Sequence, residues 1–109
     1  MGQNLKVSKT VSDTVEGVLR KVVSAIKELD FNLENIDSRS GIVRFNKRVS
    51  LGAMVYHYQC VVFDMGDGST MCTIQIVEYE GGWPWSGLMD SLGLMVSSRK
   101  LSQKILDRL

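Results

Sequence analysis

The sequence predicts an α+β fold: an antiparallel sheet of about five strands with two helices packed on one face, in the order β-α-β-β-β-β-α. Three observations predict it. Apolar residues recur every three or four positions near residues 13–29 and again at the C-terminus, which is typical of amphipathic helices. Elsewhere apolar and polar residues alternate, as in half-buried strands. A chain of 109 residues with 44% apolar and 23% charged residues suits one domain over residues 1–109.

A short strand over residues 4–9 is expected to precede the first helix. That helix is predicted to begin near Asp13, because Asp13 and Glu16 have the spacing of a capping box, with Ser12 as a competing cap. Gly17 weakens the helix by roughly 1 kcal/mol relative to alanine and is expected to allow close packing on the sheet. One apolar stripe runs along the helix: Val15, Val18, Leu19, Val22, Ala25, Ile26 and Leu29.

Residues 33–37 are predicted to form the second strand and residues 42–50 the third, with a turn at residues 38–41 between them. Alternate residues of the third strand point to opposite faces of a sheet. One face carries Val43, Phe45, Lys47 and Val49. The other face carries Ile42, Arg44, Asn46 and Arg48.

A hairpin of two long strands is predicted over residues 53–64 and 69–80. Both segments are rich in β-branched and aromatic residues, and the loop at residues 66–68 reads Gly-Asp-Gly. In a three-residue loop, Gly68 takes the left-handed position that such loops favour. A shift by one residue would divide the apolar residues between both faces. The favoured register collects them on one face for the helices to cover: Met54, Tyr56, Tyr58, Cys60, Val62, Cys72, Ile74 and Ile76.

Both cysteines of the chain lie in this hairpin. The register places Cys60 opposite Ile74 and Cys72 opposite Val62, so the cysteines are diagonal neighbours roughly 7–8 Å apart, too far for an unstrained disulfide. We therefore expect two buried free thiols in a reducing compartment. With His57 as the only histidine, the chain lacks the four Cys or His ligands of a structural zinc site. We expect neither a metal nor another cofactor.

After the hairpin, a glycine-flanked loop carries Trp83, Pro84 and Trp85, and a helical C-terminus follows. Three further apolar residues point about a quarter-turn away from the stripe of that helix: Leu88, Leu92 and Met95. The stripe itself consists of Leu94, Leu101, Ile105 and Leu109. Either the helix bends near Gly93 or residues 97–98, or it begins only after Gly93, or its first part buries a different surface such as a second subunit.

Charge and targeting signals narrow the class of protein. Thirteen basic and twelve acidic residues leave a net charge of +1, so no global field attracts nucleic acid or an anionic membrane. No apolar run reaches about 18 residues, which argues against a transmembrane helix. The N-terminus lacks the apolar region of a secretory signal, and Lys6 stands where a myristoylation motif has Ser or Thr. A cytoplasmic location is expected.

His57 is the first candidate for general-base chemistry, because its unperturbed pKa lies near neutrality. The predicted register places it opposite Val77, on the face that neither cysteine shares. The glycines at residues 66–68 join two strands, whereas a phosphate-binding loop leads into a helix N-terminus. Since the sequence brings no nucleophile, base and oxyanion hole together, we expect a protein that is not an enzyme.

Two residue clusters are candidates for binding. Trp83 and Trp85 either plug one end of the core or, together with Leu88 and Met89, form an exposed apolar patch suited to a partner protein, a second subunit or a hydrophobic ligand. The densest basic cluster on a strand offers phosphate contacts, but solvated edge strands carry such charge too, and the near-neutral net charge favours that second interpretation. This cluster comprises Arg44, Lys47 and Arg48, with Arg39 nearby.

Two short motifs resemble those of small uncharacterised bacterial domains. In those domains a Gly-Ile/Val strand follows the first helix and an Asp-Trp-Gly motif opens the last helix. Residues 41–43, Gly-Ile-Val, match the first motif, and residues 90–93, Asp-Ser-Leu-Gly, are a stretched form of the second. The layout also resembles one half of a TATA-box-binding-protein-like saddle. The resemblance implies a β-α-β(4)-α fold and carries no catalytic residues.

The sequence favours a non-catalytic binding or assembly module that acts through protein–protein contact, for example as a homodimer built through its sheet face or its tryptophan loop. The alternative is a carrier of a small hydrophobic ligand held between the sheet and the helices. Both functions draw on the same candidate residues: Trp83, Trp85, Leu88, Met89, Tyr56 and Tyr58. The third function is nucleic-acid binding through the basic strand residues Arg44, Lys47 and Arg48.

Overall fold

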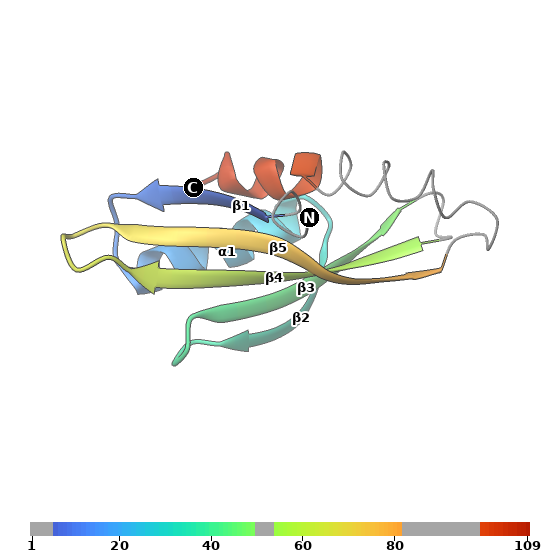
Figure 1. Cartoon of the computed structure of the whole chain (residues 1–109), viewed down its shortest axis with the longest axis horizontal. Coiled ribbons are helices and arrows are strands. Elements are labelled where there is room, and N and C mark those ends of the chain that lie inside the picture. Colours follow the sequence, from blue (N-terminus) through green and yellow to red (C-terminus); the bar gives the residue numbers. More distant parts are fainter. Residues whose placement is uncertain (1–5, 50–53, 82–98) are drawn as a thin grey trace.

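The chain folds into an antiparallel sheet with helices against it, as the sequence predicts (Figure 1). The computed structural model describes residues 6–49, 54–81 and 99–109. Its labelled elements are β1 (Lys6–Val11), α1 (Val15–Glu28), β2 (Asn32–Asp37), β3 (Ile42–Val49), β4 (Met54–Asp64) and β5 (Thr70–Gly81). Residues 99–106 are also helical and belong to the C-terminal helix. The described part of the first strand ends at Val11, two residues beyond the predicted range of 4–9.

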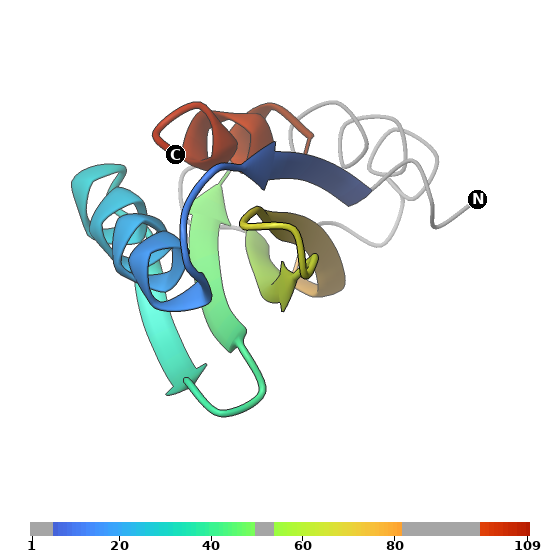
Figure 2. The same cartoon turned by 90° about the vertical axis from the view of Figure 1, so that its left-hand side faces the viewer.

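The sheet has the strand order β1-β5-β4-β3-β2, and every neighbouring pair is antiparallel. The strands that flank α1 in sequence are therefore the two opposite edges of the sheet. The connection through α1 has to cross the sheet from one edge to the other, as the view along the sheet shows (Figure 2). Side chains from α1, the sheet and the C-terminal helix share one hydrophobic core.

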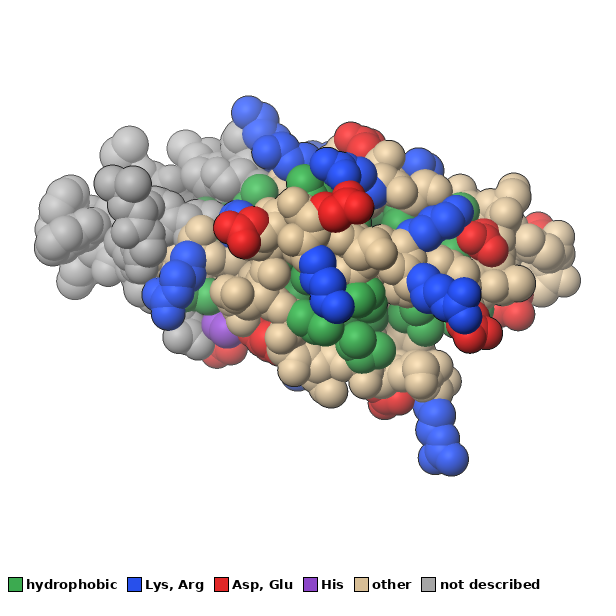
Figure 3. Space-filling view, turned by 180° about the vertical axis from the view of Figure 1, so that it is seen from behind, with side chains coloured by type: hydrophobic (Ala, Val, Ile, Leu, Met, Phe, Trp, Pro, Cys, Tyr) green, Lys and Arg blue, Asp and Glu red, His purple; other side chains and the backbone are tan. Residues whose placement is uncertain are grey.

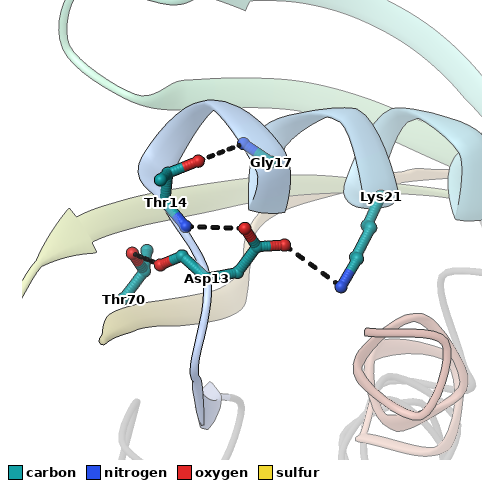
Figure 4. A network of polar contacts seen from close by, with 5 residues as sticks. All are labelled: Asp13, Thr14, Gly17, Lys21 and Thr70. Atoms are coloured by element: carbon teal, nitrogen blue, oxygen red, sulfur yellow. Dashed lines mark hydrogen bonds and ion pairs between the residues drawn. The ribbon is translucent and has the colours of Figure 1, made fainter. Parts of the chain in front are cut away.

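The first turn of α1 differs from the prediction. Thr14 is the N-cap, and its Oγ1 accepts a hydrogen bond of 3.0 Å from the backbone N–H of Gly17 (Figure 4). Asp13 stands one residue earlier and accepts from the Thr14 N–H, while its other oxygen pairs with Lys21 at 3.1 Å. These contacts, the Thr14 N–H first, lower the pKa of Asp13. A Cβ on Gly17 would lie 2.5 Å from the Asp13 carboxylate, so this carboxylate, and not the sheet, uses the open space.

The hairpin register is confirmed at its loop end. Cys60 lies opposite Ile74 and Val62 opposite Cys72, and Gly68 has a φ of +87°. Toward the other end a one-residue bulge intervenes, because Tyr58 pairs with Ile76 but His57 pairs with Glu78. The prediction that His57 faces Val77 is therefore wrong. Val77 is the additional residue of β5.

The predicted apolar face is buried, apart from Ile76, which is half-buried. Phe45 and Tyr58 stack with ring centroids 5.1 Å apart, and Phe31 meets both rings edge-on.

Cys60 and Cys72 are buried free thiols, as expected, but their sulfur atoms lie only 3.2 Å apart. This hydrogen-bonded contact, together with burial, raises the pKa of Cys60. None of the helices in the described ranges is long and apolar enough to cross a membrane.

Candidate functional site

The edge strand β2 carries two exposed apolar residues, Leu33 and Ile36. Among the described strands it pairs only with β3, and all six of its residues are exposed. A bulge shapes it: Leu33 pairs with Phe45, while Asn35 already pairs with Arg44, which leaves Glu34 as an additional residue. Ile36 then pairs with the buried Val43. Although Leu33 and Ile36 are three positions apart, the bulge therefore brings both to the helix side of the sheet.

An apolar groove runs between α1 and this edge. Its volume is about 490 Å³, and Leu19, Val23 and Ile36 supply its apolar wall. Leu33 and Ile36 are 37% and 43% exposed, which is high for large side chains beside a core. In Figure 3, hydrophobic side chains gather in the lower middle of the molecule, with charged side chains around them. We call Leu19, Val23, Leu33 and Ile36, with the edge of β2 that faces away from β3, the α1–β2 face.

The end of α1 beside this face is held by a lysine from the sheet. Lys47 donates to the backbone carbonyls of Leu29 at 3.2 Å and Asp30 at 3.1 Å, and its ammonium lies 5.2 Å from the centre of the Phe31 ring. A cation is favourable there because the last carbonyls of a helix lack partners and carry partial negative charge. Asp30 adopts a left-handed conformation with φ of 62°, which turns the chain from α1 into β2.

The predicted basic cluster is consequently divided between two faces. Lys47 points to the helix side with the buried Phe45, whereas Arg44 and Arg48 alternate with it and lie on the outer face. Both arginines are exposed. The structure therefore does not bring the three candidate nucleic-acid residues together on one surface.

On the outer face, the bulged Glu34 meets His57. Its Oε2 lies 2.7 Å from His57 Nδ1 and accepts from the Asn46 side chain at 2.5 Å, and Asn46 in turn accepts from Asn32 at 3.1 Å. Partial burial alone would raise the pKa of Glu34, but the hydrogen bonds from Asn46 and His57 and the charges of His57 and Arg44 outweigh burial and lower it.

This outer-face network orients the imidazole, and the sequence reasoning missed it. The predicted register gave His57 no carboxylate partner, because Glu34 reaches it from a strand two places away in the sheet through a bulge. Within the described ranges, no group of three or more His, Cys, Asp or Glu residues is arranged to hold a metal ion.

A second hollow, of about 410 Å³, lies between the start of α1 and the β4–β5 loop. Three carboxylates line it, from Asp13, Glu16 and Asp64, which disfavours an anionic ligand despite the helix N-terminus. Thr70 fastens this end of α1 to the sheet by donating a 2.6 Å hydrogen bond to the Asp13 carbonyl (Figure 4).

The predicted aromatic site is described only in part. Tyr56 and Tyr58 are buried on the helix side of β4, with ring centroids 6.4 Å apart. They lie toward the end of the hairpin where Met54 pairs with Gly81, the last residue of β5. The other candidates lie outside the described residues: Trp83, Trp85, Leu88 and Met89.

Comparison with known proteins adds information on the fold. No protein-family model matches the sequence, and no curated protein matches it. The solved structure of TTHA0849 from Thermus thermophilus is similar with a TM-score of 0.63 and 16% identity, covering 95% of this chain and 94% of that one. The di-domain ARO/CYC protein StfQ from the steffimycin biosynthetic pathway is similar with a TM-score of 0.52 and 16% identity. This match covers 94% of this chain and 44% of StfQ.

At this level of identity the two likenesses concern the fold alone. They support the α+β sheet architecture, whereas the resemblance to a TATA-box-binding-protein-like saddle stays a prediction. The chain shares its α+β fold with TTHA0849 and with one part of StfQ.

Proposed function

We propose that the protein is a non-catalytic assembly module that binds another polypeptide chain through the α1–β2 face. The observation that carries this proposal is the exposure of Leu33 and Ile36 beside an apolar groove, at a strand edge with which no other described strand pairs. Fully burying a leucine or isoleucine side chain is worth about 1.5–3 kcal/mol, so a partner that covers both gains appreciable free energy. The free backbone groups of an edge strand add a template for strand pairing.

The polar network on the outer face has a structural role in this proposal. Glu34 is the bulged residue of β2, and its bonds to Asn46 and His57 tie the bulge to β3 and β4. Because the bulge decides that Leu33 and Ile36 share a side, the network supports the α1–β2 face from behind.

Site-specific photo-crosslinking tests the proposal. The photoreactive residue p-benzoylphenylalanine replaces Ile36 in one version of the protein and Phe63 in a matched control, since Phe63 is also exposed but lies on the outer face. In cells that naturally express the chain, irradiation should link position 36 to a mapped site on another polypeptide. Val23→Asp, in the groove, should abolish this link. Equal crosslinking from positions 36 and 63, or a link indifferent to Val23→Asp, would exclude the proposal.

A second candidate function is the carriage of a small hydrophobic ligand between the sheet and the helices. Two observations favour it: the fold is shared with an ARO/CYC protein of a biosynthetic pathway, and Tyr56 and Tyr58 line the helix side of the sheet. The tryptophan segment follows β5 directly in the sequence and contains the remaining candidates: Trp83, Trp85, Leu88 and Met89.

Native mass spectrometry separates this candidate from the first. A carrier should retain a small molecule after purification and lose it in Tyr56→Ala, whereas Phe63→Ala on the outer face should keep it. A chain that carries no small molecule, and takes up none from a panel of polycyclic aromatic compounds, would rule out the carrier.

A further inference from the structure

We infer that the chain bound at the α1–β2 face is a second copy of this protein, docked with its β2 antiparallel to the first β2. The inference rests on the proposed function and specifies its partner. It follows from the self-complementarity of β2 in side-chain face and in charge, and from the contrast between the two sheet edges.

The bulge makes β2 self-complementary. In an antiparallel pair, residues that lie opposite each other share a face. A regular strand could not place Leu33 opposite Ile36 of a second copy, because residues three apart face opposite sides. With Glu34 as an additional residue, both lie on the helix side, so Leu33 can face Ile36 of the second copy. Two-fold symmetry then repeats the contact, and four apolar side chains meet above the joined sheets.

The same register is complementary in charge. It sets Glu34 opposite Asn35 and Asp37 opposite Asn32 of the second copy, so no two acidic residues lie directly opposite each other. Continuing the alignment beyond the strand brings Arg39, in the turn after β2, toward Asp30 of the second copy. Within the described part of the chain, neither of these two side chains forms an ion pair, and both residues are exposed. Symmetry provides two such Arg–Asp contacts.

The opposite sheet edge, β1, is built differently. On β1 the helix-side position next to the buried Cys72 is occupied by Lys9, whose ammonium binds the Leu106 carbonyl at 3.2 Å. Inward-pointing charge is one of the ways in which proteins block edge-to-edge association. The helix-side positions of β2 hold leucine and isoleucine instead.

The expected association is weak. Two paired six-residue strands with the adjoining surface of α1 bury less area than the about 1,600 Å² of a standard interface. We therefore expect a dissociation constant on the order of micromolar. Sedimentation of the purified chain over a wide concentration range should show a monomer–dimer equilibrium. Ile36→Asp should weaken the dimer at least about tenfold, since it buries a charge opposite Leu33 of the second copy. Phe63→Asp, on the outer face, should leave it unchanged.

A disulfide-trapping experiment tests the register. Chains with Leu33→Cys and chains with Ile36→Cys are mixed and oxidised with copper phenanthroline, which accepts the two electrons as two thiols form one disulfide. The mixed disulfide should exceed either homodimer. The unmodified protein is the control, because Cys60 and Cys72 are fully buried. Predominance of the Leu33→Cys homodimer would overturn the register.

Charge variants provide an independent measurement. Arg39→Glu places like charges opposite Asp30 twice and should weaken the dimer about tenfold at low salt, with a smaller effect at high salt. Asp30→Asn removes the charge and keeps a residue that tolerates the left-handed conformation, so it should weaken the dimer less.

The outcomes separate the inference from the proposed function. A chain that sediments as a monomer at every concentration, yet crosslinks from position 36 to a different polypeptide, refutes the second copy and leaves the proposed function standing. A dimer that is insensitive to Ile36→Asp refutes the inference. If, in addition, position 36 links to no polypeptide in cells, the proposed function fails as well.

Discussion

The two edges of the sheet differ in which strand supplies the lysine that binds the end of the neighbouring helix. At each edge a helix ends close to the sheet, and a lysine from the sheet binds its last carbonyls: Lys9 at the C-terminal helix and Lys47 at α1. Lys9 belongs to the edge strand β1 itself, whereas Lys47 comes from the inner strand β3. The edge strand β2 instead places Leu33 and Ile36 on the helix side.

The two edges therefore differ in the side chains that their edge strands place on the helix side. Where the edge strand supplies the cation, a charged residue lies among its helix-side residues: Lys9 stands between Val7 and Val11. Where an inner strand supplies it, the edge keeps apolar side chains that are exposed in the single chain. Variants that remove the supports of each edge should therefore differ in effect, and the greatest loss should occur at the β2 edge.

Gly41→Ala should destabilise the β2 edge most. Gly41 has a φ of +72°, and a Cβ there would lie 2.5 Å from the Val62 backbone oxygen, which cannot move without disturbing β4. We expect the free energy of unfolding in urea to fall by about 2–4 kcal/mol. Gly66→Ala is the matched control, because Gly66 has a φ of +83° but open space around it. Its loss should be about 1 kcal/mol, and equal losses at both glycines would contradict the steric argument.

Lys47→Met should destabilise the protein more than Lys9→Met. Lys47 binds two carbonyls and lies over the Phe31 ring, so its removal should lower the free energy of unfolding by about 1–2 kcal/mol. Lys9 binds one carbonyl, and its removal should have an effect of about 0.5–1 kcal/mol. Arg48→Met, on the outer face, is the control for loss of a positive charge. If Lys9→Met had the larger effect, the comparison of the two edges would be reversed.

Thr70→Val tests the hydrogen bond that joins β5 to the chain just before α1. Thr70 is 1% exposed and donates to the Asp13 carbonyl, so an isosteric valine should lower the free energy of unfolding by about 1 kcal/mol. Thr73→Val, whose hydroxyl bonds Ser8 at an exposed site, should have a smaller effect. Thermal unfolding followed by circular dichroism measures both, and an unchanged midpoint for Thr70→Val would show that the bond does not hold the helix.

A smaller, pH-dependent effect is expected at the bulge of β2. The pKa of Glu34 is lower in the folded chain than its ordinary value of 4.5, so its ionised form stabilises the fold above that pH. This contribution should disappear as the pH falls from 4.5 through the lower folded-state pKa. Glu34→Gln should therefore flatten the acid loss of stability, which urea titrations at several pH values measure. Glu16→Gln, which removes a carboxylate from an exposed ion pair, serves as the control. If it flattened the acid loss of stability equally, the effect could not be assigned to Glu34.

The periodicity of the sequence was sufficient for the elements and for most of the core. The stripe of α1 and the alternation of β4 and β5 follow from local spacing, and the loop at residues 66–68 fixes the register from Cys60 to Cys72. Local patterns work there because a three-residue loop leaves one register that keeps all apolar residues on one face. The cap was misjudged by one residue because Asp13 and Thr14 both have suitable side chains.

The two bulges and the character of the two edges depend on tertiary pairing. Val77 becomes an additional residue only through the pairing of β5 with β4, and Glu34 only through the pairing of β2 with β3. The local spacing of residues therefore predicts neither the pairing of His57 with Glu78 nor the contact of His57 with Glu34. Composition and alternation establish which side chains are apolar and which of them share a face of a regular strand. Whether Leu33 and Ile36 end up together, exposed and beside a groove depends on strand order, because edges are a property of the whole sheet.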